Sequence, residues 1–381
     1  SPLLKYPGGK EKELKYILPN LPADCVDYYE PFVGGGAVYF AVRARRCYIN
    51  DKSPELVGLY RMVQEQNPRF LQAVSDMEHC WRMLDDVTEA CREELTGIYT
   101  SCRRKSARTL ERRVDELISR RGSAFESVIR ERFPQGIEAF LPQIAKSLKD
   151  KMARMGKLER QKGKLSREDL RLNLEGAVKN GAYIHFRYLY NHIEELALEP
   201  PVATALYFFI REYCYSSMFR YNQEGKFNVP YGGISYNKKS MAKKIQYFSE
   251  KELIDHLGDT VVENLDFQEF FRRHRPESRD FVFLDPPYDS EFSTYAGNEF
   301  GRRDQERLAD FLIRDCQAYF MLVIKNTDFI RSLYPAGQKT AGGRWLCVGM
   351  FDKKYVVSFQ DRNDKSAQHL IITNYPLNHE A

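Results

Sequence analysis

Short apolar runs near the N-terminus alternate with helix-like stretches, the pattern expected of a parallel sheet covered by helices. Residues 26–29 and 47–49 have the composition of strands, and residues 37–46 between them are spaced as a helix. Pro54 then stands where a second helix can begin. This order predicts one βαβ unit of an open, doubly wound sheet.

A second stretch of the same kind extends from about residue 261 to residue 375. Residues 304–316 have helical spacing and lie between apolar runs of strand length. The runs predicted as strands are 281–284, 320–324, 356–359 and 370–373. We therefore expect an α/β fold in which both ends of the chain contribute strands to one sheet.

The central part of the chain is mostly polar and has helical spacing, most clearly over residues 114–121 and 145–160. The sequence thus predicts a sheet domain built from residues 1–66 and 247–381. A helical domain, residues 67–246, is inserted between these two parts.

The composition is typical of a globular protein, with 43% hydrophobic and 29% charged residues. No apolar run approaches the ~20 residues that a membrane-spanning helix needs. The eight cysteines are scattered, and none forms a C-x-x-C pair. The cysteine pattern favours reduced thiols in the cytoplasm and no metal site. The lack of a long apolar run predicts that no membrane is involved.

The net charge of +5 is unevenly distributed along the chain. Residues 101–180 contain 21 Lys and Arg against 11 Asp and Glu, a balance of +10, so the remainder carries −5. Two interpretations remain open for this basic segment, a solvated helical hairpin or a surface that contacts nucleic-acid phosphates. The cations considered for phosphate contact are Lys157, Arg160, Lys162 and Lys164.

The first chemical motif is the run Glu-Pro-Phe-Val-Gly-Gly-Gly at residues 30–36, directly after a predicted strand. Glycines at such a position let the backbone approach a ligand closely. Asp51 follows the next predicted strand and suits hydrogen bonds from ribose hydroxyls. An ordinary loop with a solvated aspartate is the alternative for this motif alone.

The second motif is Asp-Pro-Pro-Tyr at residues 285–288, after the apolar run 281–284. Open α/β sheets bind ligands at the carboxyl ends of their strands. The prolines have no N–H, so Asp285 and the Pro286 carbonyl form a pair of acceptors suited to an exocyclic amine. Tyr288 adds a flat face on which a base can stack. A stiff loop with an N-capping aspartate is the alternative.

Together with Lys-Tyr-Pro-Gly-Gly-Lys at residues 5–10, these motifs in this order resemble the Dam-type (D12 class, alpha group) DNA N6-adenine methyltransferases. Residues 211–222 and 225–232 resemble the target-recognition part of that family. The resemblance covers about residues 3–75 and 183–376, interrupted by the basic segment. It implies a Rossmann-like sheet that binds S-adenosyl-L-methionine, with the inserted domain as the target-recognition domain.

The resemblance also implies roles for individual residues, with double-stranded DNA as the partner. The catalytic residues would be Asp285, Pro286, Pro287 and Tyr288. The cofactor-binding residues would be Tyr6, Gly8, Gly9, Lys10, Glu30, Pro31, Phe32, Gly34, Gly36, Asp51, Asp266, Phe267 and Asp285, with the pair 266–267 at the cofactor's adenine. The DNA-binding residues would be Lys5, Tyr215, Ser216, Met218, Arg220, Asn222 and Asn228.

The chain departs from the family at positions that bear on the target sequence. It has Tyr-Ser-Ser-Met at residues 215–218 where relatives often have Tyr-Asn-Gly-Leu. It also has Gly233 where some relatives have an arginine. A GATC target is therefore not implied.

The expected reaction is direct methyl transfer to N6 of a flipped adenine. Hydrogen bonds from N6 to Asp285 and the Pro286 carbonyl would localise the nitrogen lone pair, so catalysis depends mainly on positioning. N4-cytosine methylation suits the same acceptors and is one alternative. A catalytically silent DNA-binding regulator is another.

Overall fold

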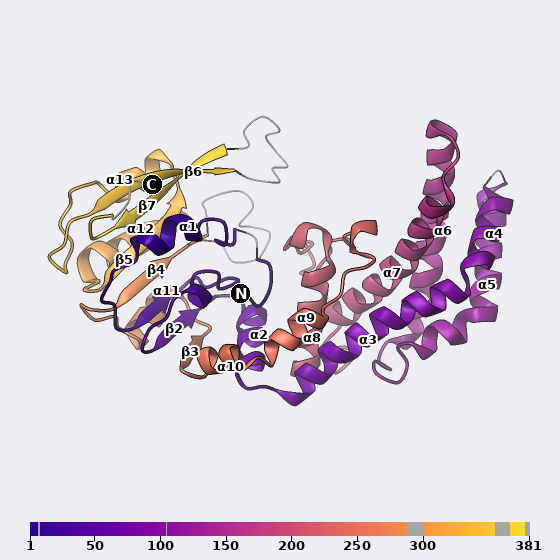
Figure 1. Ribbon diagram of the computed structural model, residues 1–381, viewed down its shortest axis with the longest axis horizontal. Coiled ribbons are helices and arrows are strands. Elements are labelled where there is room, and N and C mark those ends of the chain that lie inside the picture. Colours follow the sequence, from indigo (N-terminus) through magenta and orange to yellow (C-terminus); the bar gives the residue numbers. More distant parts are fainter. Residues whose placement is uncertain (7, 104, 288–299, 355–365, 378–381) are drawn as a thin grey trace. The chain divides into compact units, whose positions relative to one another are not determined.

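The computed structural model describes residues 1–6, 8–103, 105–287, 300–354 and 366–377 (Figure 1). The chain divides into two compact units. Unit 1 consists of Ser1–Gln64 and Lys251–Ala381, and unit 2 of Glu65–Glu250.

Unit 1 contains a seven-stranded sheet with the order β3-β2-β1-β4-β5-β7-β6. Neighbouring strands pair in parallel from β3 through β2, β1 and β4 to β5. Strand β7 pairs antiparallel with both β5 and β6. The central strand β4 is buried along its whole length, which explains its continuous apolar sequence. The strands are β1 (Tyr28–Glu30), β2 (Cys47–Asn50), β3 (Thr260–Glu263), β4 (Phe281–Leu284), β5 (Tyr319–Lys325), β6 (Cys347–Lys354) and β7 (Ser366–Thr373).

Helices α11, α12 and α13 cover one face of this sheet, where Phe270, Leu308 and Ile330 pack against strand residues such as Val282 and Leu322. The helices of unit 1 are α1 (Leu14–Ile17), α2 (Pro54–Gln64), α10 (Lys251–Gly258), α11 (Phe267–Arg273), α12 (Arg302–Asp310) and α13 (Asp328–Leu333).

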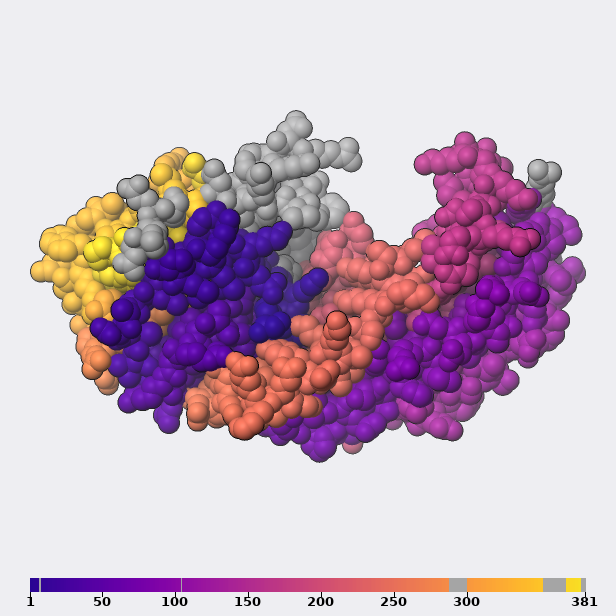
Figure 2. Space-filling model, viewed as in Figure 1, coloured from indigo at the N-terminus to yellow at the C-terminus, as the bar shows by residue number. Residues whose placement is uncertain are grey.

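The two ends of unit 1 contact each other. The rings of Tyr16 in α1 and Phe351 in β6 lie 4.9 Å apart, and the Tyr375 hydroxyl donates to the Asn20 carbonyl at 2.9 Å. In Figure 2 the indigo N-terminal residues accordingly lie beside the yellow C-terminal ones.

The predicted α/β fold is confirmed, as are the strands expected at 47–49, 281–284, 320–324 and 370–373. The strand expected at 356–359 lies outside the described residues. Strands β3 and β6 were not among the predicted strands.

The helix predicted over residues 37–46 is wrong. Only a 3-10 turn forms, Tyr39–Ala41, and Val42 is already extended. Beyond it, the Arg45 N–H donates to the Val26 carbonyl at 3.0 Å, and the Arg45 guanidinium pairs with Asp27 at 2.8 Å. Pairing with the β1 segment therefore replaces the helical hydrogen bonds that the local sequence would allow.

Unit 2 is mostly helical. Asn67 caps its first long helix by accepting from the Phe70 N–H at 3.0 Å, and Trp81 packs in its core 4.5 Å from the Tyr213 ring. The helices are α3 (Pro68–Ala90), α4 (Arg92–Cys102), α5 (Ala107–Ser127), α6 (Phe140–Lys162), α7 (Arg167–Asn191), α8 (Pro200–Tyr213) and α9 (Ala242–Phe248).

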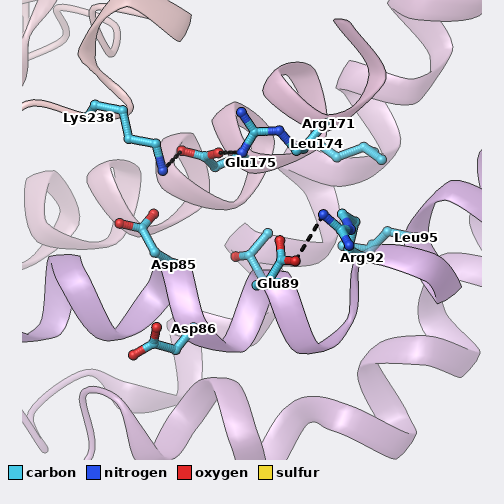
Figure 3. A pocket seen from close by; sticks show the side chains of 10 residues that line it. Asp85, Asp86, Glu89, Arg92, Leu95, Arg171, Leu174, Glu175 and Lys238 are labelled. Carbon is cyan, nitrogen blue, oxygen red and sulfur yellow. Dashed lines mark ion pairs between the residues drawn. The ribbon is translucent and has the colours of Figure 1, made fainter. Parts of the chain in front are cut away.

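A cavity of about 210 Å³ in unit 2 is lined mostly by charged side chains from α3, α4, α7 and the segment at Lys238 (Figure 3). Glu175 pairs with Lys238 at 3.1 Å and with Arg171 at 3.6 Å, and Arg92 pairs with Glu89 at 2.9 Å. These pairs balance charge around the cavity and tie the segment at Lys238 to helix α7.

Candidate active site and recognition segment

The glycine-rich loop follows β1 and turns back sharply over residues 31–36. Gly34 and Gly36 have φ angles of +49° and +77°, which other residues rarely adopt. A Cβ atom on Gly36 would lie 2.5 Å from the Tyr60 hydroxyl. The Gly34 N–H donates to Asp51 Oδ2 at 3.0 Å, and its carbonyl accepts from the Tyr60 hydroxyl at 3.0 Å. The predicted glycine loop and Asp51 are therefore in direct contact.

Asp51 lies just beyond β2. Its Oδ1 accepts from the Ser53 N–H at 3.0 Å, and burial raises the pKa of the carboxyl. The neighbouring Asn50 is buried and donates through Nδ2 to the carbonyls of Pro31 and Leu265, each at 3.0 Å. Asn50 thus ties together the loops after β1 and β3. From the sequence alone Asn50 had no assigned role, because the two carbonyls it contacts are distant in sequence.

The N-terminal segment covers the glycine loop. A Cβ on Gly34 would lie 3.1 Å from Cδ1 of Tyr6, so the tyrosine ring packs directly on this loop. The Gly9 N–H donates to the Tyr6 carbonyl at 3.0 Å, and Gly8 has a φ of +79°. Lys5, the predicted DNA contact in this segment, is exposed.

The centre of the site is an ion pair between Lys10 and Asp285. Lys10 Nζ lies 2.5 Å from Asp285 Oδ1 and donates to the Gly8 carbonyl at 3.1 Å, although its side chain is only 3% exposed. Glu30 is buried nearby and accepts from the Tyr28 hydroxyl at 2.6 Å. Burial and the charge of Asp285 raise the pKa of Glu30 well above its usual range. The ionised form of Glu30 is therefore disfavoured, and Lys10 and Asp285 form the close ion pair of the site.

The turn after β4 also contacts helix α12. Pro286 is buried and Pro287 exposed, and the Pro287 carbonyl accepts from Gln305 Nε2 at 3.1 Å. Tyr288, the predicted stacking residue, lies outside the described residues.

The pair predicted at the cofactor's adenine lies after β3. Asp266 caps α11 by accepting from the Gln268 N–H at 3.0 Å. The buried Phe267 ring lies 5.7 Å from Phe32 in the glycine loop and 5.9 Å from Phe300. The loops after β1, β2 and β3 therefore combine close backbone approach, a carboxylate and aromatic rings, which fits a cofactor with a nucleoside part.

In unit 2 the residues predicted to contact DNA form two neighbouring features, of which the first is a hairpin. Arg220 Nε donates to Asn228 Oδ1 at 2.9 Å across the bridge between Tyr221 and Phe227. Asn222 closes the turn, because its Oδ1 accepts from the Lys226 N–H at 2.9 Å.

The second feature is a kinked turn just before the hairpin. Ser216 and Ser217 both have a φ of +52°, and Tyr215 is 45% exposed. The Met218 carbonyl accepts from buried Arg211 at 2.9 Å. An aromatic ring is thus held outward by a turn that is fixed from the interior of unit 2.

The basic segment contains two kinds of cation. On α5, Arg113 pairs with Glu116 at 3.2 Å, and Arg121 pairs with Glu94 of α4 at 2.5 Å. The four cations predicted to contact phosphates are exposed and have no ion pair within the described part of the chain. They lie at and just beyond the end of α6, which stands out from unit 2 in magenta in Figure 2. These four are Lys157, Arg160, Lys162 and Lys164.

Comparison with known proteins gives a consistent set of relatives. A sequence profile described as D12 class N6 adenine-specific DNA methyltransferase matches residues 6–96 and 138–341. A type II methyltransferase, M.CviBI of Paramecium bursaria Chlorella virus NC1A, is 24% identical over 98% of this chain and 99% of its own length. The DNA adenine methylase of Haemophilus influenzae is 31% identical over 36% of this chain and 48% of its own length. The retron Ec67 DNA adenine methylase of Escherichia coli is 31% identical over 43% and 55%, respectively.

The matched ranges correct the predicted extent of the resemblance. Residues 138–180, placed in an unmatched basic segment, lie within the matched part, and only residues 97–137 separate its two blocks. A polar helical stretch has a periodic pattern but no short motif, so the sequence did not mark this part as similar to the family. Among the described residues, no helix could span a membrane and no cluster of His, Cys, Asp or Glu could hold a metal ion.

Proposed function

Because the chain belongs to the family of D12 class N6 adenine-specific DNA methyltransferases, we propose how its parts carry out site-specific methylation of adenine in DNA. This proposal rests mainly on the ion pair between Lys10 and Asp285, which lies at the carboxyl end of β4 next to the glycine loop. N4-cytosine methylation and a silent regulator, the two alternatives, are not favoured by this family.

S-adenosyl-L-methionine is the proposed methyl donor, and its bound sulfonium supplies an electrophilic methyl group. Gly34 and Gly36 let the cofactor approach the backbone, and Asp51 accepts from its ribose hydroxyls. Asp266 and Phe267 contact its adenine. Tyr6 closes this pocket from the N-terminal segment, since its ring already packs on Gly34.

The target adenine binds at the turn after β4. The Asp285 carboxylate and the Pro286 carbonyl accept hydrogen bonds from N6, and Tyr288 stacks on the base. The Lys10 ammonium favours the ionised form of Asp285, which is the form that accepts. N6 must lose a proton after methylation, and the same carboxylate is placed to receive it.

Double-stranded DNA is recognised by unit 2 in this proposal. Tyr215 inserts into the base stack, and Arg220 reads a base edge while Asn228 holds its Nε. The exposed cations at the end of α6 contact phosphates outside the target sequence.

Replacement of the catalytic carboxylate tests the proposal. Asp285→Ala should lower methyl transfer by more than about 10²-fold, because N6 loses a preorganised acceptor. The measurement is tritiated methyl incorporation into DNA, together with thermal melting. Asp310→Ala, at an exposed position of α12, is the control. A folded Asp285→Ala protein with near-wild-type turnover would overturn the assignment.

A further inference from the structure

Helix α12 contacts two of the loops that form the candidate site. Gln305 Nε2 donates to the Pro287 carbonyl at 3.1 Å, in the turn after β4. Two residues further along, Arg307 NH2 donates to Asp266 Oδ1 at 2.7 Å, in the loop after β3. One short rigid element therefore contacts both the proposed catalytic turn and the proposed adenine contact.

The hydrogen bond from Gln305 compensates for a property of the catalytic turn. Pro286 and Pro287 have no backbone N–H, so neither can donate a backbone hydrogen bond within the turn. Gln305 is 0% exposed and is followed on the same helix by buried Leu308 and Ala309. A buried amide at such an apolar position costs free energy unless it is hydrogen-bonded. Packing alone does not explain why a glutamine occupies this position, whereas its hydrogen bond to the Pro287 carbonyl does.

Arg307 holds the second loop through several interactions. Its guanidinium lies 4.8 Å from the centre of the Phe267 ring and donates to Gln268 Oε1 at 2.7 Å. It also donates to Asp304 Oδ1 at 2.6 Å, within α12 itself. A planar guanidinium with several donors fixes its partners more tightly than an ammonium would. The side chains of Asp266 and Phe267 are thus oriented from α12.

We propose that α12 aligns the catalytic turn with the adenine end of the cofactor site, with Gln305 and Arg307 as positioning residues. This inference rests on the proposed roles of residues 285–288 and 266–267. Methyl transfer needs the donor and N6 in line, and a misplacement of ~1 Å costs on the order of 10²-fold in rate. Because both hydrogen bonds come from one helix, a shift of α12 would move the two loops together and keep them in register.

Two substitutions on α12 should have different kinetic effects. Gln305→Met keeps the size of the side chain and removes the donor. It should lower the single-turnover rate at saturating DNA and S-adenosyl-L-methionine by roughly 10- to 100-fold, with cofactor Kd nearly unchanged. Arg307→Met should instead raise the Kd for the cofactor by about 10-fold, the scale of one charge-assisted hydrogen bond, with a smaller effect on the saturated rate. Arg307→Lys should recover part of the affinity.

Arg303→Met is the matched control, because Arg303 is exposed on the same helix. All variants are measured by rapid-quench methylation, by cofactor calorimetry and by thermal melting. If Gln305→Met does not fold, Gln305→Asn keeps the amide but is too short to reach Pro287. Variants that lower the melting temperature yet keep wild-type rate and Kd would overturn the inference, since α12 would then be merely structural.

Failure of the inference is distinguishable from failure of the proposed function. Asp285→Ala is measured in the same assay. If it is inactive while the Gln305 and Arg307 variants behave like Arg303→Met, only the positioning role is wrong. If Asp285→Ala keeps its turnover, the catalytic assignment itself is wrong, and the inference falls with it.

Discussion

Charged side chains have different roles in the two units. At the strand termini of unit 1 they form a buried ion pair, whereas on the basic helices of unit 2 they are mostly exposed. Lys10 and Asp285 come from distant parts of the sequence and meet at 2.5 Å with the lysine almost fully buried. On α5, Arg113 and Glu116 are close neighbours in sequence and both are exposed. A buried pair fixes the geometry and ionisation of its members, whereas an exposed pair contributes only ~0–1 kcal/mol to stability. Charge count therefore says little about function, and the partners of each charge say more.

The strongest test of this contrast removes the buried cation. Lys10→Met should lower the saturated methylation rate by roughly 10²-fold, because Asp285 loses the ammonium group that holds its carboxylate in place. Without the ammonium, protonation of Asp285 becomes easier, so activity should be lost at a higher pH on the acid side. The measurement is the pH dependence of the single-turnover rate. Lys10→Arg keeps the charge and should restore the acid side of the profile; an unchanged profile in Lys10→Met would contradict the contrast.

Removal of the exposed cations at and just beyond the end of α6 should change DNA binding without changing the rate of methyl transfer. The slope of log affinity against log salt should become shallower by up to ~0.9 for each phosphate that is no longer neutralised, equally for all DNA sequences. The saturated methylation rate should stay unchanged. The variant replaces with glutamine the residues Lys157, Arg160, Lys162 and Lys164.

A matched variant on α5 sharpens this test, because its arginines are ion-paired. We expect a smaller change of salt slope for it, since these guanidinium groups already have carboxylate partners. Equal slopes for both variants and the parent would mean that the basic segment does not contact DNA. The α5 variant replaces with glutamine the residues Arg112, Arg113, Arg120 and Arg121.

Arg220→Ala should change the sequence preference for DNA rather than the salt dependence of binding. If its guanidinium reads a base edge, the substitution costs roughly 1–3 kcal/mol and relaxes the preference at one position of the target. Plasmid methylation in vivo, followed by modification-sensitive sequencing, gives the methylated motif for parent and variant. An identical motif in both would exclude Arg220 as a specificity residue.

The smallest effect on methylation is expected for a buried titratable group in unit 2, which should change stability alone. His185 is 0% exposed among the rings of Phe140, Phe186 and Tyr188, and burial lowers its pKa to about 3. Below pH ~6.5 the unfolded chain gains a proton that the folded chain does not bind. The free energy of unfolding should therefore fall by up to ~1.4 kcal/mol per pH unit between pH 6.5 and 3.

His185→Phe should remove this part of the acid sensitivity. Urea unfolding at pH 7 and pH 5 measures it, and fluorescence of Trp81 in a Trp345→Phe background reports on unit 2. We expect the variant to lose less stability than the parent on acidification. An equal loss in both proteins would show that other groups govern the acid response.

The candidate site positions that are easiest to locate from the sequence are those that directly follow an apolar run. Gly34, Asp51 and Asp285 each stand beyond such a run, so their place at one edge of a parallel sheet follows from topology. Asn50 and Gln305 could not be found this way, because their partners are backbone carbonyls of loops distant in sequence. Their roles depend on three-dimensional packing that no spacing in the sequence expresses.

The same limit applies to the basic segment. Its positive balance is evident from composition, but composition does not tell which cations are already paired. Arg121 pairs with Glu94, which lies outside residues 101–180, whereas Lys157 on α6 has no such pair within the described residues.

The 3-10 turn at Tyr39–Ala41 could not be predicted from local sequence either. It forms in place of a helix because the Val26 carbonyl accepts the backbone hydrogen bond of Arg45.

The arrangement of the sheet has a consequence for the order of events during synthesis. Strand β1 lies between β2 and β4, and β4 is synthesised only after the whole of unit 2. Unit 2 is continuous in sequence, so it has all of its residues available first, while β1 waits with one edge unpaired. Lys10 meets its carboxylate partner only when β4 arrives. A nascent chain therefore has all of unit 2 before the ion pair of unit 1 can form, and a chain that stops before β4 lacks Asp285 altogether.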